Sequence, residues 1–105
     1  MLDLFKNLFG GAPAVDFNAL LQTGALIVDV RTAGEFNQGH IKGSLNIPLD
    51  QIGAKIATLK SKNVPVITVC RSGNRSGAAA GILKNAGIEV YNGGAWDSLE
   101  SQITR

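Results

Sequence analysis

The sequence predicts an α/β fold in which a small parallel β-sheet is flanked by helices on both faces. Short apolar runs rich in β-branched residues alternate along the chain with segments that have helical periodicity. Several of these runs are continuous, which is typical of strands buried on both faces of a parallel sheet. Strands that alternate with helices form such sheets because each helix carries the chain back across one face. A chain of 105 residues with 45% hydrophobic content is enough for one domain.

The first half of that domain is expected to begin with a helix over 16–22, which the aspartate at its start can cap. Residues 25–30 (Ala-Leu-Ile-Val-Asp-Val) are typical of a short buried strand. The threonine that begins 32–36 can cap one helical turn. Residues 44–47 predict a second strand, which Pro48 ends because proline has no N–H to donate.

The second half of the domain continues the same alternation. It is predicted to contain a helix, a strand, a helix, a strand and a weaker final helix, over 49–60, 66–69, 74–86, 88–91 and 95–102. Gly87 is at the position just past a helix end where glycine is favoured. The residues Asn92, Gly93 and Gly94 are expected to form a turn.

Residues 1–14 are expected to form an N-terminal segment, separate from the domain over 15–105. Leu2, Phe5 and Phe9 fall at helical spacing, so this segment can form a short amphipathic helix. We expect such a helix to pack on its own domain. Docking to a partner or to a membrane surface is the alternative.

Composition argues against several classes of function. A net charge of +2, with no block of like charges, argues against nucleic-acid binding. One cysteine and one histidine exclude an intramolecular disulfide and a structural zinc site, and we expect neither a metal nor a cofactor. No apolar run reaches the roughly 18 residues that a transmembrane helix needs. Polar residues at positions 3, 6 and 7 interrupt the apolar start of the chain, which argues against a signal peptide, so we expect a cytoplasmic protein.

The most informative segment is Cys70-Arg71-Ser72-Gly73-Asn74-Arg75-Ser76, between a predicted strand and a predicted helix. Ligands of parallel sheets bind outside the carboxyl ends of the strands, and Cys70 is at such an end. Nearby cations and a helix N-terminus both lower the pKa of a thiol, and the thiolate is the nucleophile. The alternative is a buried, inert cysteine, but two arginines within five positions favour a reactive one.

The same segment is expected to bind an anion at the sulfur. The backbone N–H groups of a tight loop can converge on one point, and Gly73 can adopt the positive φ that such a loop needs. Ser72 and Ser76 can add hydroxyl donors, or they can form the turn and cap the helix. The candidate binding residues are therefore Arg71, Ser72, Gly73, Asn74, Arg75 and Ser76. Sulfur transfer and phosphoryl transfer both use this design.

Asp29 and Arg31 end the first predicted strand, at the same sheet edge as Cys70. They could tune the site directly. We favour a structural role, in which Arg31 and Glu35, four residues apart, form an ion pair that orders the turn.

The chain resembles the single-domain rhodaneses, a family of sulfurtransferases, from about Val15 to its end. The segment 70–76 resembles the active-site loop of that family. Further matches follow the family's order, at Asp29-Val30-Arg31, Glu35-Phe36, Gly39-His40-Ile41, Gly43, Asn46-Ile47-Pro48 and Gly93-Gly94. One feature departs from the family pattern: Trp96 follows the glycine pair after a single residue, which puts the start of the last helix in doubt.

The resemblance implies a mechanism. The Cys70 thiolate takes the outer sulfur of a small anionic donor such as thiosulfate, and the resulting persulfide passes it to cyanide, a thiol or a protein acceptor. Arg71 and Arg75 are the candidates to bind the sulfonate group. No general base is needed, and His40 is implied to be a turn residue that bonds to the backbone.

Two other functions remain open. Phosphatase relatives of the fold, and arsenate reductases, need an arginine six positions after the cysteine, where this chain has Ser76. A non-catalytic rhodanese-like module that binds partner proteins is the other alternative, and an intact Cys70 argues against it.

Overall fold

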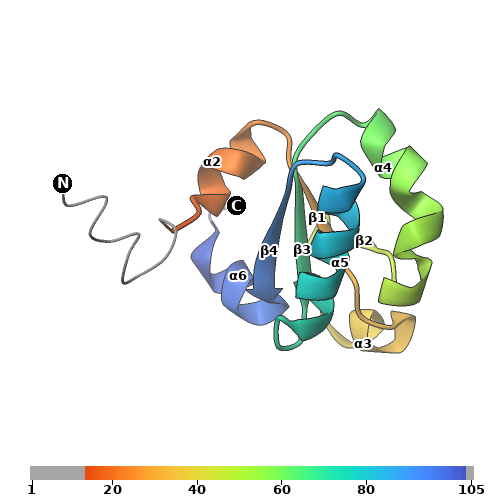
Figure 1. Ribbon diagram of the computed structural model, residues 1–105. Helices are drawn as coiled ribbons and strands as arrows, with labels where there is room; N and C mark the ends of the chain where they lie inside the picture. The colour runs from red at the N-terminus through yellow and green to blue at the C-terminus, as the bar shows by residue number, and fades with distance from the viewer. Residues whose placement is uncertain (1–13, 104–105) are drawn as a thin grey trace, which may run out of the picture.

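One sheet of four parallel strands lies at the centre of the computed structural model, which describes residues 14–103 (Figure 1). The strands are β1 (Leu26–Asp29), β2 (Leu45–Asn46), β3 (Val66–Cys70) and β4 (Val90–Ala95). Their order in the sheet is β2-β1-β3-β4, and each neighbouring pair is parallel. The predicted α/β class is therefore confirmed. The helix expected at the N-terminus falls outside the described residues.

Helices cover both faces of the sheet. They are α2 (Phe17–Gln22), α3 (Ala33–Gln38), the 3-10 helix η1 (Leu49–Lys55), α4 (Ile56–Ser61), α5 (Asn74–Asn85) and α6 (Trp96–Gln102). In Figure 1, α2 and α6 lie on one side of the sheet, α4 and α5 lie on the other, and α3 lies near the carboxyl ends of the strands. Within residues 14–103, no helix is long and apolar enough to cross a bilayer.

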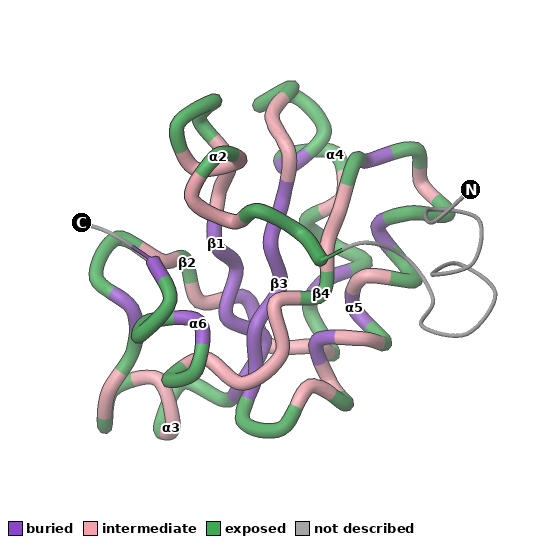
Figure 2. The backbone as a smooth tube through the Cα atoms, turned by 90° about the vertical axis from the view of Figure 1, so that its left-hand side faces the viewer, coloured by how far each residue is buried: buried purple, intermediate pink, exposed green. Residues whose placement is uncertain are grey.

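The hydrophobic core has two layers, one on each face of the sheet. Alternate residues of a strand point to opposite faces. Val28 and Val66 pack in the layer that η1, α4 and α5 cover. Ile27 and Ile67 pack with Leu99 in the layer that α2 and α6 cover. Because β1 and β3 are buried along almost all of their length (Figure 2), their sequences are continuous apolar runs.

The predicted helix signals are confirmed at three positions. The Asp16 carboxylate accepts a hydrogen bond from the Ala19 N–H at 3.0 Å and caps α2. The Thr32 hydroxyl accepts one from the Glu35 N–H at 3.2 Å, and the Glu35 side chain accepts one from the Thr32 N–H in return, which forms a capping box at the start of α3. Gly87 follows α5 with a φ of +87°.

The predicted helix over 49–60 is divided in the structure. Its first seven residues form η1, and only the segment from Ile56 onward is α-helical. Pro48, at the cap position of η1, offers no side-chain hydrogen bond, and Gly53 in the middle of η1 weakens regular helix. A short 3-10 segment at a helix start is common under these conditions.

The expected turn at Asn92–Gly94 was wrong, because these residues belong to β4. The strand pairs Thr68 with Asn92 but Val69 with Gly94, so Gly93 is an extra residue in a β-bulge. A Cβ on Gly93 would lie 2.8 Å from Ile67 Cγ2, so only glycine fits here without displacement of the neighbouring strand. Glycine pairs are typical of turns, but they also occur where a strand must accept a close neighbour.

Candidate active site

β3 places Cys70 at the carboxyl edge of the sheet, between its neighbours β1 and β4. The chain turns immediately after Cys70, and α5 begins at Asn74. Gly73 makes this turn with a φ of +97°, a left-handed conformation that residues with a Cβ rarely adopt. The turn brings the first N–H groups of α5 back toward the sulfur.

Two backbone N–H groups are directed at the Cys70 sulfur. The Gly73 N–H donates to Sγ at 3.0 Å, and the Ser76 N–H donates to it at 3.3 Å. The Cys70 thiol in turn donates to Ser76 Oγ at 3.3 Å. Both Cys70 and Ser76 are 0% exposed. The expected arrangement of N–H groups around the sulfur is therefore present.

This environment favours the thiolate. Burial raises the pKa of Cys70, but the hydrogen bond with the Ser76 side chain and the N–H groups of Ser76, Gly73 and Ser72 outweigh that effect. The pKa of Cys70 is therefore below that of an ordinary thiol. Hydrogen bonds to the charged form are the cause, as in other anion sites built from backbone N–H groups.

Arg75 forms an ion pair with Glu35. Its two guanidinium nitrogens Nη1 and Nη2 lie 2.7 and 3.0 Å from the two carboxylate oxygens, which links α5 to α3 across the carboxyl edge of the sheet. The hydrogen bond from Arg75, aided by those from Thr32, lowers the pKa of Glu35 from 4.5 to about 2. Arg75 is one of the two candidates to bind a sulfonate, and its guanidinium is already paired with the Glu35 carboxylate.

The expected ion pair between Arg31 and Glu35 does not form. Arg31 instead binds Asp29, with Nη2 at 2.7 Å from Oδ2 and Nε at 2.9 Å from Oδ1. It reaches Glu35 only at the backbone carbonyl, at 3.3 Å. The carboxylate of Glu35 is bound to Arg75 and Thr32, whereas Asp29 is two residues from Arg31 and buried beside it.

Arg71 is the loop cation that remains available. It is exposed, and it forms no ion pair with any residue in 14–103. It borders a hollow of about 310 Å³ at the carboxyl edge of the sheet, whose other lining residues are Arg31, Glu35, Gln38, Gly39, Trp96 and Asp97. The Trp96 ring lies 4.7 Å from the Arg31 guanidinium, which holds the indole over that buried cation.

Comparison with known proteins identifies the family. The family described as "Rhodanese-like domain" matches residues 13–97, most of the chain. The chain belongs to the rhodanese-like domain family. The resemblance inferred from the sequence motifs is thus confirmed.

Three proteins illustrate how close this rhodanese-like domain is to others. It is 42% identical over 69 residues to the uncharacterized protein YqhL of Bacillus subtilis, covering 65% of this chain and 54% of that protein. It is 39% identical over 69 residues to the thiosulfate sulfurtransferase PspE of Escherichia coli, covering 64% of this chain and 66% of that one. A solved E. coli rhodanese with anions matches with a TM-score of 0.64 and 36% identity, over 70% of this chain and 88% of that one. The chain thus spans just over half and about two thirds of the two curated relatives.

Other residues expected in the site have smaller roles in the rhodanese-like domain. His40 hydrogen-bonds through Nδ1 to the Phe36 carbonyl at 2.8 Å and stacks on the Phe36 ring, so the expectation of a turn residue is confirmed. Ser72 is exposed, and its N–H makes the smallest of the contributions that lower the pKa of Cys70. Asn74 is exposed at the first residue of α5.

Sequence reasoning missed the role of Asn92. Its Oδ1 accepts hydrogen bonds from the Ser76 hydroxyl at 2.6 Å and from the Gly94 N–H at 2.9 Å. Its Nδ2 donates to the Gly73 carbonyl at 3.2 Å. The available signal was a polar amide directly before a glycine pair, and a turn near the mouth of the site was expected there, but that expectation did not indicate the hydrogen bonds of the amide to Ser76 and Gly73.

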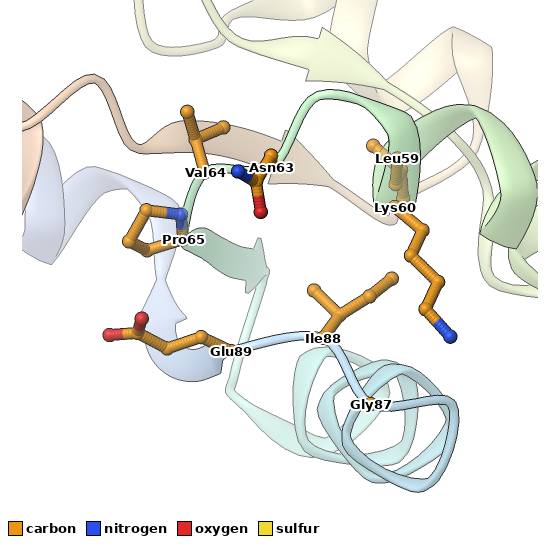
Figure 3. A pocket seen from close by; sticks show the side chains of 8 residues that line it. All are labelled: Leu59, Lys60, Asn63, Val64, Pro65, Gly87, Ile88 and Glu89. Atoms are coloured by element: carbon orange, nitrogen blue, oxygen red, sulfur yellow. The ribbon is translucent and has the colours of Figure 1, made fainter.

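A second hollow, drawn in Figure 3, lies at the opposite end of β3. Its eight lining residues are Leu59, Lys60, Asn63, Val64, Pro65, Gly87, Ile88 and Glu89. They precede β3 and β4, whereas Cys70 ends β3. Cys70 does not line this hollow, which is separate from the candidate active site.

The ion pair between Glu35 and Arg75 predicts a pH dependence of stability. Folding lowers the pKa of Glu35 from 4.5 to about 2, so the stabilisation is complete above about pH 4.5 and is lost as the pH falls toward 2. Urea unfolding at several pH values should show that Glu35→Gln is less stable than wild type near neutrality, and that the difference shrinks below pH 4.5. Glu100→Gln, at an exposed site in α6, should follow the wild-type profile. A Glu35→Gln difference that stays constant down to pH 2 would contradict the assignment.

Proposed function

We propose that this rhodanese-like domain is a sulfurtransferase, in which Cys70 carries a sulfane sulfur from a donor such as thiosulfate to a thiophilic acceptor. The observation that supports this most is the convergence of the Gly73 and Ser76 N–H groups on Sγ. Donors aimed at Sγ stabilise the negative charge of the thiolate, which is both the attacking group of the first step and the leaving group of the second. The similarity to a protein named thiosulfate sulfurtransferase supports this choice of donor.

The reaction has two displacement steps. The Cys70 thiolate forms a bond to the outer sulfur of thiosulfate, whose bond to the sulfonate sulfur breaks and leaves its electron pair on sulfite. The terminal sulfur of the Cys70 persulfide is then attacked by cyanide or a thiolate acceptor, and the electron pair of the S–S bond returns to Cys70. Covalent catalysis of this kind divides one difficult transfer into two easier ones.

The loop residues 71–76 divide the task of binding the donor. Gly73 and Ser76 supply the N–H hydrogen bonds at the sulfur, the exposed Ser72 lies in the turn before them, and Asn74 is the first residue of α5. Arg71 is exposed and unpaired among the described residues, so it is the cation that meets the anionic donor. Arg75 has a supporting role through Glu35. The hollow beside Arg71 gives the donor, and then a thiol or persulfide acceptor, a place to bind.

Intact-mass spectrometry after incubation with thiosulfate tests the proposal. We expect the wild-type chain to gain the mass of one sulfur atom and the Cys70→Ser variant to gain nothing, because the chain has no other cysteine. Subsequent cyanide should remove the added sulfur as thiocyanate. If no sulfur donor leaves an adduct, a partner-binding module becomes the better interpretation. Cys70-dependent hydrolysis of p-nitrophenyl phosphate would instead favour a phosphatase.

The same adduct assay tests whether Arg71 binds the donor. Arg71→Ala should need about tenfold more thiosulfate for the half-maximal rate, since a charge-assisted hydrogen bond is lost. Lys84→Ala removes an exposed cation from the far end of α5 and should leave that concentration unchanged. Equal behaviour of the two variants would show that Arg71 does not bind the donor.

A further inference from the structure

The side chain of Asn92 connects three parts of the candidate site. It accepts hydrogen bonds from Ser76, which contacts the sulfur, and from Gly94, which belongs to its own strand. It donates to the carbonyl of Gly73, whose N–H also points at the sulfur. Gly73 and Gly94 face each other closely enough that a Cβ on Gly73 would lie 3.6 Å from the Gly94 Cα. β4 is thus joined to the active-site loop through one amide.

The backbone fixes the direction of every hydrogen bond in this network. The Gly94 N–H can only donate, so the Asn92 atom 2.9 Å away is the oxygen. That oxygen has no proton, so the Ser76 hydroxyl must donate to it, at 2.6 Å. Ser76 Oγ then has only lone pairs left for Cys70, and the thiol donates to them at 3.3 Å. The side-chain bonds from Cys70 through Ser76 to Asn92 therefore require a protonated Cys70, whereas the Gly73 and Ser76 N–H groups can donate to the sulfur in either state.

Ionisation of Cys70 changes this network at one bond. A thiolate has no proton to donate, so lone pairs of Sγ and Ser76 Oγ would face each other unless the hydroxyl rotates toward the sulfur. When it rotates, Asn92 Oδ1 loses the Ser76 donor but keeps the Gly94 N–H. The bond between Ser76 and Asn92 thus exists only while Cys70 is protonated. A bond made in one protonation state alone stabilises that state.

The charged groups around Cys70 take no part in this change of hydrogen bonds. β1 contributes the Asp29–Arg31 pair and α3 contributes Glu35, which is paired with Arg75 of α5. Arg71 follows Cys70, and Asp97 of α6 lines the same hollow as Arg71. The part of β4 beside the site, Asn92–Ala95, has no charged residue. These charges stay the same when Asn92 is replaced by a neutral residue.

We propose that Asn92 is a positioning residue that controls, through the Ser76 hydroxyl, whether the sulfur of Cys70 carries a proton. The inference deepens the proposed function, and it rests on Cys70 as the sulfur carrier. Loop N–H groups alone would favour a very acidic thiol, and nucleophilicity falls as acidity increases. Asn92 opposes that trend, so that the thiolate keeps more of its nucleophilicity.

The test measures the Cys70 pKa from the ultraviolet absorbance of the thiolate, with the Cys70→Ser variant subtracted. Asn92→Ala should lower the pKa by about half to one unit, because a bond specific to the thiol is removed. Asn92→Asp should raise the pKa, since a carboxylate holds the Ser76 proton more firmly and adds negative charge. In the Ser76→Ala background, Asn92→Ala should have no further effect.

If Asn92 only shaped the loop, Asn92→Ala and Asn92→Asp would shift the Cys70 pKa in the same direction. That outcome would overturn the proposal. The proposal would also be overturned if Asn92→Ala still shifted the Cys70 pKa in the Ser76→Ala background. Circular dichroism confirms that each variant is folded, and Asn92→Asp is nearly isosteric. Since no sulfur donor is present, the pKa result stands even if wild-type protein forms no adduct with thiosulfate. That failure would count against the proposed function alone.

Discussion

Replacement of Asp29 by alanine is expected to lower the free energy of unfolding by about 3–5 kcal/mol, because it breaks a buried ion pair and leaves one charge in place. Asp29 is 0% exposed and the Arg31 side chain 5% exposed. Without the carboxylate, the guanidinium keeps only the carbonyls of Glu35 and Gly39 as acceptors. Neither carries the negative charge that a buried cation needs.

Urea unfolding followed by circular dichroism measures this effect. Asp50→Ala is the matched control, because it removes an exposed carboxylate from η1 and should change stability by no more than about 0.5 kcal/mol. Combining Asp29→Ala with Arg31→Met should cost less than the sum of the two single changes, since neither charge is then left alone. If Asp29→Ala costs no more than Asp50→Ala, the pair does not stabilise the fold.

Gly93→Ala should lower the free energy of unfolding by about 3 kcal/mol, the upper range for overpacking a core. The added Cβ would meet Ile67 Cγ2 at 2.8 Å, and the Thr68 carbonyl oxygen and Val69 Cγ1 at 3.0 Å. These atoms belong to β3, the central strand that carries Cys70. The strands must therefore separate, and the loop after β3 should shift with them, so sulfur transfer should also weaken.

Gly81→Ala is expected to have the opposite effect on the stability of the same chain. Gly81 lies within α5, and a Cβ there would meet nothing within 4 Å. Alanine should therefore stabilise the helix by about 0.5–1 kcal/mol. Thermal unfolding of the two variants should show one midpoint below wild type and one above it. A midpoint for Gly93→Ala at or above the wild-type value would contradict the close approach of β4 to β3.

Local features of the sequence predicted the fold well because the deciding interactions are local. Caps such as Asp16 and Thr32 act on residues three positions away, and continuous apolar runs mark strands buried on both faces. The length of β4 was underestimated because a bulge depends on the strand beside it. The pattern Asn-Gly-Gly alone does not distinguish a bulge from a turn.

Contacts between residues close in sequence were easier to predict at the site than contacts between distant segments. Cys70 and Gly73 are three positions apart, so a strand–loop–helix pattern was enough to bring them together. Arg75 and Glu35 are 40 positions apart in sequence, and Ser76 and Asn92 are 16 apart. Which arginine pairs with which carboxylate depends on how α3 packs near α5, and no spacing rule along the chain describes that.

The complete burial of Cys70 has a kinetic consequence. The sulfur of a residue with 0% exposed surface is reached only when the structure around it opens, even slightly. Observed rates with any electrophile then combine the frequency of that opening with the rate of bond formation. Slender reagents need a smaller opening than bulky ones, so the ratio of their reaction rates indicates how far the structure opens. The pH dependence of each rate indicates the ionisation of the thiol.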